Sequence, residues 1–213
     1  MEKNNGKTLG LAQLSMFVAI IIIMAFVPFL GYIPLGPLKA TTLHIPVIIA
    51  SVVLGPKKGA FLGFVFGLTS FINNSFISPS VISFVFTPLY SFGDAGGNLL
   101  SLVVCFLPRI LVGVFPYYVY KGINKLLKEK DKNIFALACA GVVGSLTNTI
   151  LVMSFIYIFF GGAYSAAKNI ALEAFLPFII GVVGTNGLPE ALVAAMFTIA
   201  IAGELIRFKN SKR

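Results

Sequence analysis

Apolar residues along this chain gather in six runs, separated by polar, glycine-rich or proline-rich segments. A membrane-spanning helix needs about 20 predominantly apolar residues. We therefore expect helices at about residues 8–30, 43–55, 58–73, 98–120, 133–160 and 187–207. The second and third runs are short, but Gly55-Pro56-Lys57-Lys58-Gly59 between them predicts a hairpin turn at a water interface rather than one broken span.

Two longer connections, 74–97 and 161–186, still carry apolar residues. Each is too short or too interrupted to form another span. We expect both to form structured lids or re-entrant segments, which a bilayer tolerates only where protein or water covers the backbone. Asp94 and the Gly96-Gly97 pair predict a turn within the first connection.

The composition places these helices in a membrane. Of the 213 residues, 58% are hydrophobic and 11% are charged, whereas soluble domains are about 25% charged. We therefore expect one domain, residues 1–213, that is an all-α membrane protein: a six-transmembrane-helix bundle with structured outer loops. The first run is longer than a signal-peptide core and no small-residue cleavage site follows it, so we expect it to stay as a membrane helix.

The basic residues predict the orientation of the bundle. Thirteen of the 16 lysines and arginines lie near the termini, in the turn after the second run, or between the fourth and fifth runs. Short cytoplasmic loops are enriched in such residues, so both termini are expected to be cytoplasmic. This accounts for the net charge of +9 without nucleic acid, because no basic segment interleaved with aromatic residues is present.

Polar side chains recur at a similar depth on five predicted helices. At about 1.5 Å per residue, they lie roughly 20–25 Å from the basic turns, in the outer part of the hydrocarbon core. Ionisable residues at such depth usually face the bundle interior and are functional candidates. The candidate substrate-binding residues, roofed by the outer loops, are Lys39, Thr41, His44, Asn73, Asn74, Arg109, Asn148, Asn186 and Glu190.

Structural roles remain open for several of these residues. One alternative is that Arg109 and Glu190 pair only with each other and hold two helices together. Asn148 is equally suited to joining helices by a hydrogen bond. His44 follows a proline- and glycine-rich loop and is suited to capping the second helix, and Lys39 is suited to being a solvated loop residue.

The first helix has no interior charge, and it carries small residues at Ala12, Ser15 and Ala19. Ser15 and Ala19 are four residues apart, a spacing that lets another helix approach closely. Two interpretations are open: an ordinary contact inside the bundle, or a docking face for a separate membrane subunit.

The chain has no GxxxxGK[ST] nucleotide loop, HExxH or GxSxG motif, so we expect neither ATP hydrolysis nor an enzyme. With one histidine, and two cysteines in apolar runs, we expect no metal site and no cofactor. Two other classes stay open: a self-sufficient secondary transporter or channel, and a membrane enzyme acting on lipid or peptide.

Several segments together resemble the substrate-binding subunits (S components) of energy-coupling factor (ECF) vitamin transporters. They are the small-residue face of the first helix, GYIPLG–LKATTLHIP, LGPKKGAFLGFVFG, LPRILVGVFPYYVYKGI and TNGLPEALVAAMF. The resemblance covers essentially the whole chain. TTLHIP, the Asn73-Asn74 pair and PRILVG look most like the pantothenate-specific subunits; riboflavin and hydroxymethylpyrimidine are the alternative substrates.

This resemblance implies a mechanism and partners. The subunit, in the plasma membrane of a prokaryote, would take a vitamin from outside and join a membrane coupling (T) subunit that carries two ATPase subunits. It would then topple in the bilayer to release the vitamin inside. Ala12, Ser15 and Ala19 match the family's docking face. A cationic side chain would pair with the pantothenate carboxylate, asparagines with its amide and hydroxyls, and apolar lids with its dimethyl group.

Overall fold

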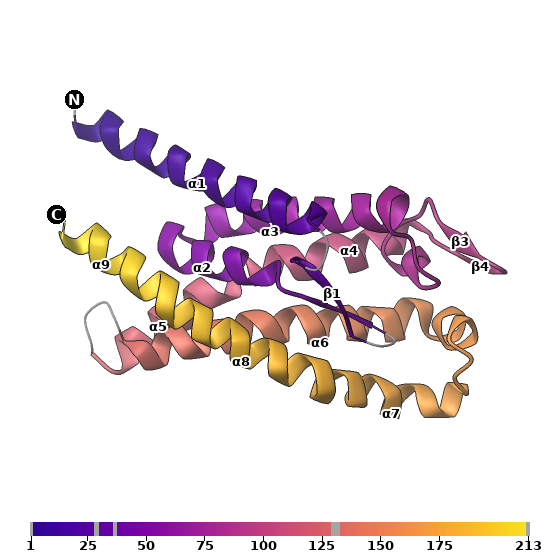
Figure 1. Cartoon of the computed structure of the whole chain (residues 1–213). Coiled ribbons are helices and arrows are strands. Elements are labelled where there is room, and N and C mark those ends of the chain that lie inside the picture. Colours follow the sequence, from indigo (N-terminus) through magenta and orange to yellow (C-terminus); the bar gives the residue numbers. More distant parts are fainter. Residues whose placement is uncertain (1, 28–29, 36–37, 129–132, 212–213) are drawn as a thin grey trace.

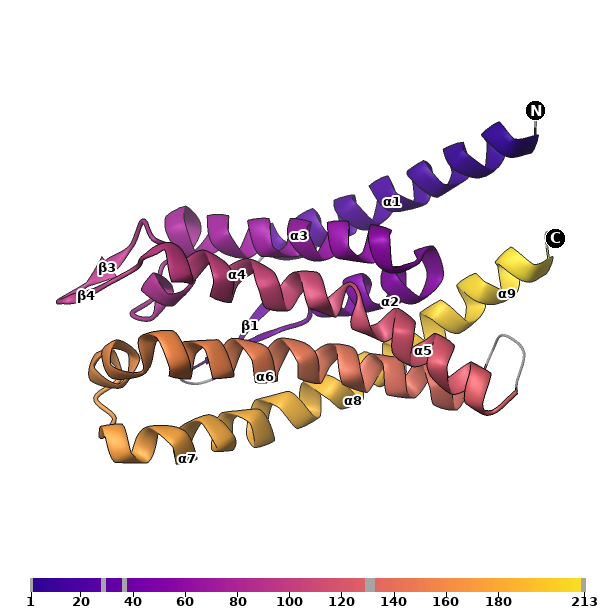
Figure 2. The ribbon, with the colours of Figure 1, turned by 180° about the vertical axis from the view of Figure 1, so that it is seen from behind.

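The computed structural model describes residues 2–27, 30–35, 38–128 and 133–211. Its helices form an elongated bundle in which both termini lie at the same end (Figure 1). The opposite end, called the far end below, holds the small hairpin β3–β4, Ser91–Phe92 and Ala95–Gly96. It also holds the connection between α6, Ile134–Ala167, and α7, Leu172–Val182. The Lys57-Lys58 turn after α2, His44–Leu54, and the carboxyl end of α5, Phe115–Leu126, lie toward the end that holds the termini (Figure 2), in agreement with the charge pattern.

All six expected helices are present in the described part of the chain. Five are long and apolar enough to cross a membrane: Thr8–Phe26, Pro56–Ile77, Leu99–Leu126, Ile134–Ala167 and Leu172–Phe208. The sixth is the shorter α2, His44–Leu54. It meets α3, Pro56–Ile72, at Gly55, whose φ of 94° suits the tight reversal predicted at this point.

Several helix boundaries differ from the expected ones. Helix α1 spans Glu2–Phe26 and ends before residue 30. The fourth span consists of α4, Leu99–Val112, and α5, Phe115–Leu126, and so runs past residue 120. Helix α6, Ile134–Ala167, continues seven residues past the predicted end. The helix continues through Gly161-Gly162, because glycine is tolerated within membrane helices.

The expectation that 161–186 forms a lid is wrong. Helix α7, Leu172–Val182, runs through a π-helical turn, η3, Val183–Gly187, into α8, Leu188–Phe197. A second π-helical turn, η4, Thr198–Ala202, leads into α9, Gly203–Ser211. The wider turn η3 accommodates the Gly-Thr-Asn-Gly sequence that suggested a break, so the last span is one long helix.

The connection 74–97 is structured, as expected. It contains the π-helical turn η1, Asn73–Ile77, the 3₁₀ turn η2, Ser83–Val85, and the β3–β4 hairpin. Gly93, with a φ of 57°, and Asp94 form the two-residue hairpin loop, which confirms the turn predicted at Asp94. The turn predicted at Gly96-Gly97 is wrong, because Gly96 pairs with Ser91 as part of β4. A second hairpin pairs β1, Tyr32–Leu35, with β2, Leu38–Thr41, and lies between the α1–α4 half and the α6–α8 half of the bundle (Figure 1).

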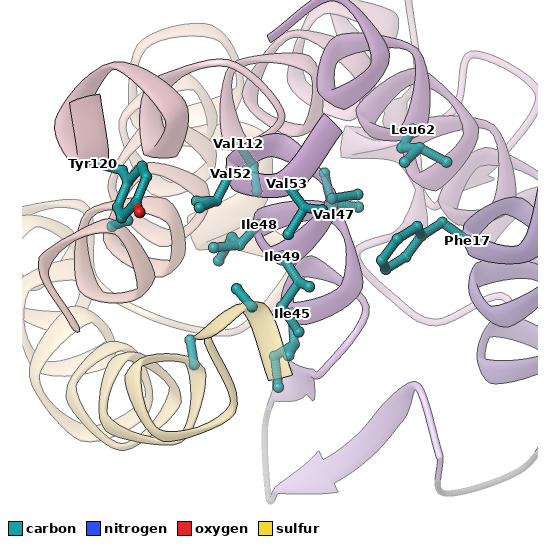
Figure 3. Close-up of a cluster of buried hydrophobic side chains, with 14 of the residues drawn as sticks. Phe17, Ile45, Val47, Ile48, Ile49, Val52, Val53, Leu62, Val112 and Tyr120 are labelled. Carbon is teal, nitrogen blue, oxygen red and sulfur yellow. The ribbon is translucent and has the colours of Figure 1, made fainter. Parts of the chain in front are cut away.

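The core has two parts. One surrounds α2, which is buried along almost its whole length by α1, α3, α5, α6 and the last span, as Figure 3 shows for Ile48, Val52 and Tyr120. The other lies toward the far end, where Ile82, Phe84 and Val85 of the 74–97 connection pack against α4, α6 and α7. The bundle is therefore closed at the far end by apolar side chains of this connection.

Candidate substrate-binding site

Close glycine contacts set the relative heights of the helices. A Cβ on Gly59 would lie 2.0 Å from Gly113 O and 3.0 Å from Ser51 Cα, so these three residues share one level. A Cβ on Gly63 would lie 2.2 Å from Arg109 O. His44 is seven residues from Ser51 and Arg109 is four from Gly113, so both lie about 6–10 Å toward the far end.

The remaining candidates on α6 and α8 reach the same height. A Cβ on Gly144 would lie 2.5 Å from Ile48 Cγ1, and Asn148 and His44 are each four residues farther along these antiparallel helices. Glu190 Oε2 accepts a hydrogen bond from Thr149 Oγ1 at 3.4 Å. The structure therefore brings His44, Asn148 and Glu190 to one level, with Arg109 within about 5 Å of that height.

This level lies about as far from the basic turns as the sequence predicted. Helix α6 continues 19 residues beyond Asn148, about 29 Å, and begins 14 residues before it, about 21 Å. Segments of two outer loops reach this level, because Thr41 of β2 binds Glu190 and Phe86 of the 74–97 connection contacts Arg109. Helix α6 extends farther beyond this level than predicted, since it ends at Ala167 rather than at residue 160.

Arg109 is a buried cation on α4, with 6% of its surface exposed. Its guanidinium carbon lies 5.6 Å from the ring centroid of Phe66 and 5.2 Å from that of Phe86, and Nη1 donates to Val104 O at 2.6 Å. Both ring contacts favour a cation at this position. Phe66 and Phe86 were missed by the sequence analysis, since nothing in their spacing distinguishes them from core residues.

His44 and Asn148 present buried polar atoms toward the interior. His44 is 1% exposed, and neither ring nitrogen has a hydrogen-bond partner of normal geometry among the described residues. His44 does not cap α2 with its side chain; Leu43 is the N-cap, and its N–H is bonded by Thr41 Oγ1 at 3.3 Å. Asn148 Oδ1 is likewise buried without a partner in the described part, so this oxygen does not join helices. Such atoms are costly unless a ligand or water meets them.

Both carboxylate oxygens of Glu190 accept hydrogen bonds from other elements of this chain. Oε1 accepts from the backbone N–H of Thr41 at 3.0 Å, and Oε2 accepts from Thr149. The interpretation of Glu190 as the ion-pair partner of Arg109 is therefore not the arrangement found. Thr149 was missed by the sequence analysis, although its position beside Asn148 in a polar Thr-Asn-Thr sequence is a signal that it belongs here.

The two asparagines at the end of α3 differ in their roles. Asn73 is buried at the helix end, where its carbonyl accepts from Ser78 N–H. Asn74 Nδ2 donates to Ser70 O, and Asn74 Oδ1 accepts from Ser83 Oγ at 3.1 Å. The Asn74 amide thereby fastens the 74–97 connection to α3, which is a structural role.

The last two candidates, Asn186 and Lys39, take no part in the contacts given above for the other candidates. Asn186 is half-buried in η3, and its Oδ1 accepts a hydrogen bond from the neighbouring Thr185 Oγ1 at 3.3 Å. The backbone of Lys39 belongs to β2, but its side chain lies outside the described part of the structure.

Comparison with known proteins matches residues 10–202 to the family "ECF transporter, substrate-specific component". The chain is 37% identical over 208 residues to the pantothenic acid transporter PanT of Lactococcus lactis subsp. cremoris, covering 96% of this chain and 97% of that protein. It is 29% identical over 209 residues to the pantothenate transporter PanT of Leuconostoc mesenteroides subsp. mesenteroides, covering 95% of each.

The fold also has a counterpart among solved structures. The chain resembles the crystal structure of the S component for biotin from an ECF-type ABC transporter, with a TM-score of 0.52 and 18% identity over 93% of each chain. At this identity the likeness concerns the fold alone. Together with its apolar helices, the family match makes the chain a multi-pass plasma-membrane protein, and it belongs to the family of ECF transporter substrate-specific components.

Proposed function

We propose that this S component binds pantothenate and delivers it to an ATP-driven coupling module. Two relatives that align over nearly the whole chain carry the name pantothenate or pantothenic acid transporter, which supports this substrate. Pantothenate combines a carboxylate, an amide, two hydroxyls and a gem-dimethyl group. The site therefore needs one cation, several hydrogen-bonding groups and an apolar wall.

One observation carries the choice of an anionic vitamin: a guanidinium, 6% exposed, lies at nearly the same height as the buried polar atoms of His44 and Asn148. A guanidinium presents planar donors that match a carboxylate. In this proposal Arg109 binds the carboxylate of pantothenate, because a buried cation and a buried anion together cost less than either alone.

The other groups of the vitamin have suitable partners at the same height. Asn148 Oδ1 accepts a hydrogen bond from a hydroxyl or the amide N–H, and neutral His44 offers one ring donor and one ring acceptor. Phe66 of α3 and Phe86 of the 74–97 connection, whose rings lie against the Arg109 guanidinium, provide apolar surface for the dimethyl group. This assignment leaves Asn74 and Glu190 out of direct ligand contact.

Helix α1 supports a docking role for its small residues. Phe17, Ile21 and Ala25 are buried against the bundle, whereas Ala12, Ser15 and Ala19 are exposed. This exposure favours the docking role over a contact inside the bundle. In the proposal they meet the membrane coupling subunit, which carries the two ATPase subunits, with both termini of this chain in the cytoplasm.

Equilibrium binding to the purified protein tests the substrate. Detergent-solubilised protein, freed of any co-purifying small molecule, is titrated with radiolabelled pantothenate and, in parallel, with biotin, riboflavin and hydroxymethylpyrimidine. Saturable binding of pantothenate alone supports the proposal. Saturable binding of one of the other three without pantothenate binding overturns the substrate while leaving the family membership untouched.

A further inference from the structure

Glu190 connects three elements that are distant in the sequence. Its Oε1 accepts the N–H of Thr41 in β2, at 3.0 Å, and its Oε2 accepts the hydroxyl of Thr149 in α6, at 3.4 Å, while the residue itself lies in α8. Thr41 and Glu190 are 149 residues apart. The carboxylate therefore fastens the β1–β2 hairpin to the opposite half of the bundle.

The hairpin register explains why Thr41 needs this acceptor. Tyr32 lies opposite Thr41, and the next pair, Gly31 and Thr42, is joined by a bond from Thr42 N–H to Gly31 O at 3.1 Å. Hydrogen-bonded and non-bonded pairs alternate in an antiparallel ladder, so the N–H of Thr41 points away from β1. β2 is an edge strand here, and an edge N–H without an acceptor is strongly unfavourable in a bilayer.

We propose that Glu190 is a positioning residue that latches the β1–β2 hairpin over the binding level, so that the vitamin passes only after the bond between Glu190 and Thr41 has broken. The part that concerns the vitamin rests on the proposed function. Thr41 is three residues from His44, and Thr149 adjoins Asn148, so the latch closes beside the buried His44 ring and the Asn148 Oδ1 atom, which has no hydrogen-bond partner in the described part of the chain. Figure 1 shows the hairpin crossing between the two halves of the bundle at this place.

The geometry predicts a graded response to substitution. Glu190→Ala removes both acceptors, whereas Glu190→Gln keeps a carbonyl oxygen for Thr41 N–H but loses the charge that strengthens the bond. Thr149→Val leaves the carboxylate in place and removes a hydroxyl that lies 3.4 Å from both Glu190 Oε2 and Ser145 O. The latch should weaken least in Thr149→Val, more in Glu190→Gln and most in Glu190→Ala.

Hydrogen–deuterium exchange of the full-length protein in detergent, without vitamin, tests the latch. The peptide that covers residues 38–43 should exchange on the order of tenfold or more faster in Glu190→Ala than in the unsubstituted protein, with Glu190→Gln in between. Exchange in α4 serves as the control for the fold. If Glu190→Ala disrupts α4 as well, the isosteric Glu190→Gln decides. Unchanged exchange at 38–43 in a folded Glu190 variant overturns the latch.

The rate of vitamin release provides the functional readout. The first-order dissociation rate of bound radiolabelled pantothenate should rise across the three variants in the same order as exchange at residues 38–43. Faster exchange with an unchanged dissociation rate would show that the hairpin is not on the vitamin's path, which overturns the proposal. If the unsubstituted protein binds no pantothenate, the proposed substrate fails, and the exchange experiment still decides whether Glu190 holds the hairpin.

Discussion

The guanidinium carbon of Arg109 lies 5.2 Å from the ring centroid of Phe86, so a residue of the 74–97 connection covers a buried cation of α4. This contact couples the segment that closes the far end of the bundle to the group that we assign to the vitamin's carboxylate. The side chain of Phe86 thus affects both the closure of the site and the positioning of Arg109.

Replacing this ring should weaken vitamin binding without unfolding the protein. Phe86→Leu keeps apolar volume but removes a cation–π contact of about 0.5–2 kcal/mol, so the Kd for pantothenate should rise about 2- to 30-fold. Isothermal titration calorimetry measures it. Phe92→Leu is the matched control, because Phe92 lies exposed in the β3–β4 hairpin and should leave the Kd unchanged. Equal effects of the two substitutions would contradict a specific role for Phe86.

The contact between α3 and α4 should not tolerate a methyl group at Gly63. A Cβ there would lie 2.2 Å from Arg109 O, so Gly63→Ala must push the two helices apart and displace Arg109. Overpacking of this kind costs about 1–3 kcal/mol. A thiol-reactive dye reports unfolding because Cys105 is buried, and the variant should melt at a lower temperature.

Gly122→Ala is the control for this substitution. It also lies within a helix, but a Cβ there would have nothing within 4 Å. Alanine is the better helix former by about 0.5–1 kcal/mol, so this variant should melt at the same temperature or higher. Comparable destabilisation by both substitutions would mean that the close approach at Gly63 does not decide stability.

The sequence predicts the helices of this protein well, because hydrophobic runs and interrupting turns are local signals. It fails for α7, because residues 161–186 were expected to be too interrupted to span, whereas Pro177 lies within α7 and the glycines around Asn186 lie within η3. Membrane helices tolerate such residues when neighbouring groups or π-helical turns satisfy the backbone. The last span is continuous because of these π-helical turns, and a count of apolar residues cannot predict them.

For the site, the sequence predicts how far along the bundle each candidate side chain lies. It does not predict which way that side chain points from its helix axis. The rise per residue correctly placed His44, Asn148 and Glu190 together. It could not show that Glu190 faces Thr41 and Thr149, or that Arg109 faces Phe66 and Phe86, because these contacts depend on helix rotation. Asn74 shows the same limit: its depth suited a ligand contact, yet its amide binds Ser70 and Ser83.

Ala19→Trp should separate vitamin binding from transport. Ala19 is exposed on α1, so the bulky ring leaves the interior of this chain intact but blocks close approach by a coupling subunit. The Kd of the purified subunit should stay unchanged, while ATP-dependent uptake by cells that carry the whole transporter should be abolished. Ile180→Trp, at an exposed position of α7, is the control and should support normal uptake. Unimpaired uptake by Ala19→Trp would remove the docking role from this face.

The most direct test of the account compares two ligands and two proteins by calorimetry. The ligands are pantothenate and its alcohol analogue, in which CH₂OH replaces the carboxylate; the proteins are the unsubstituted chain and Arg109→Gln. If Arg109 binds the carboxylate, the unsubstituted protein should prefer pantothenate by on the order of tenfold or more, and Arg109→Gln should lose most of that preference. Tight pantothenate binding with the same preference for the carboxylate in both proteins would contradict the account.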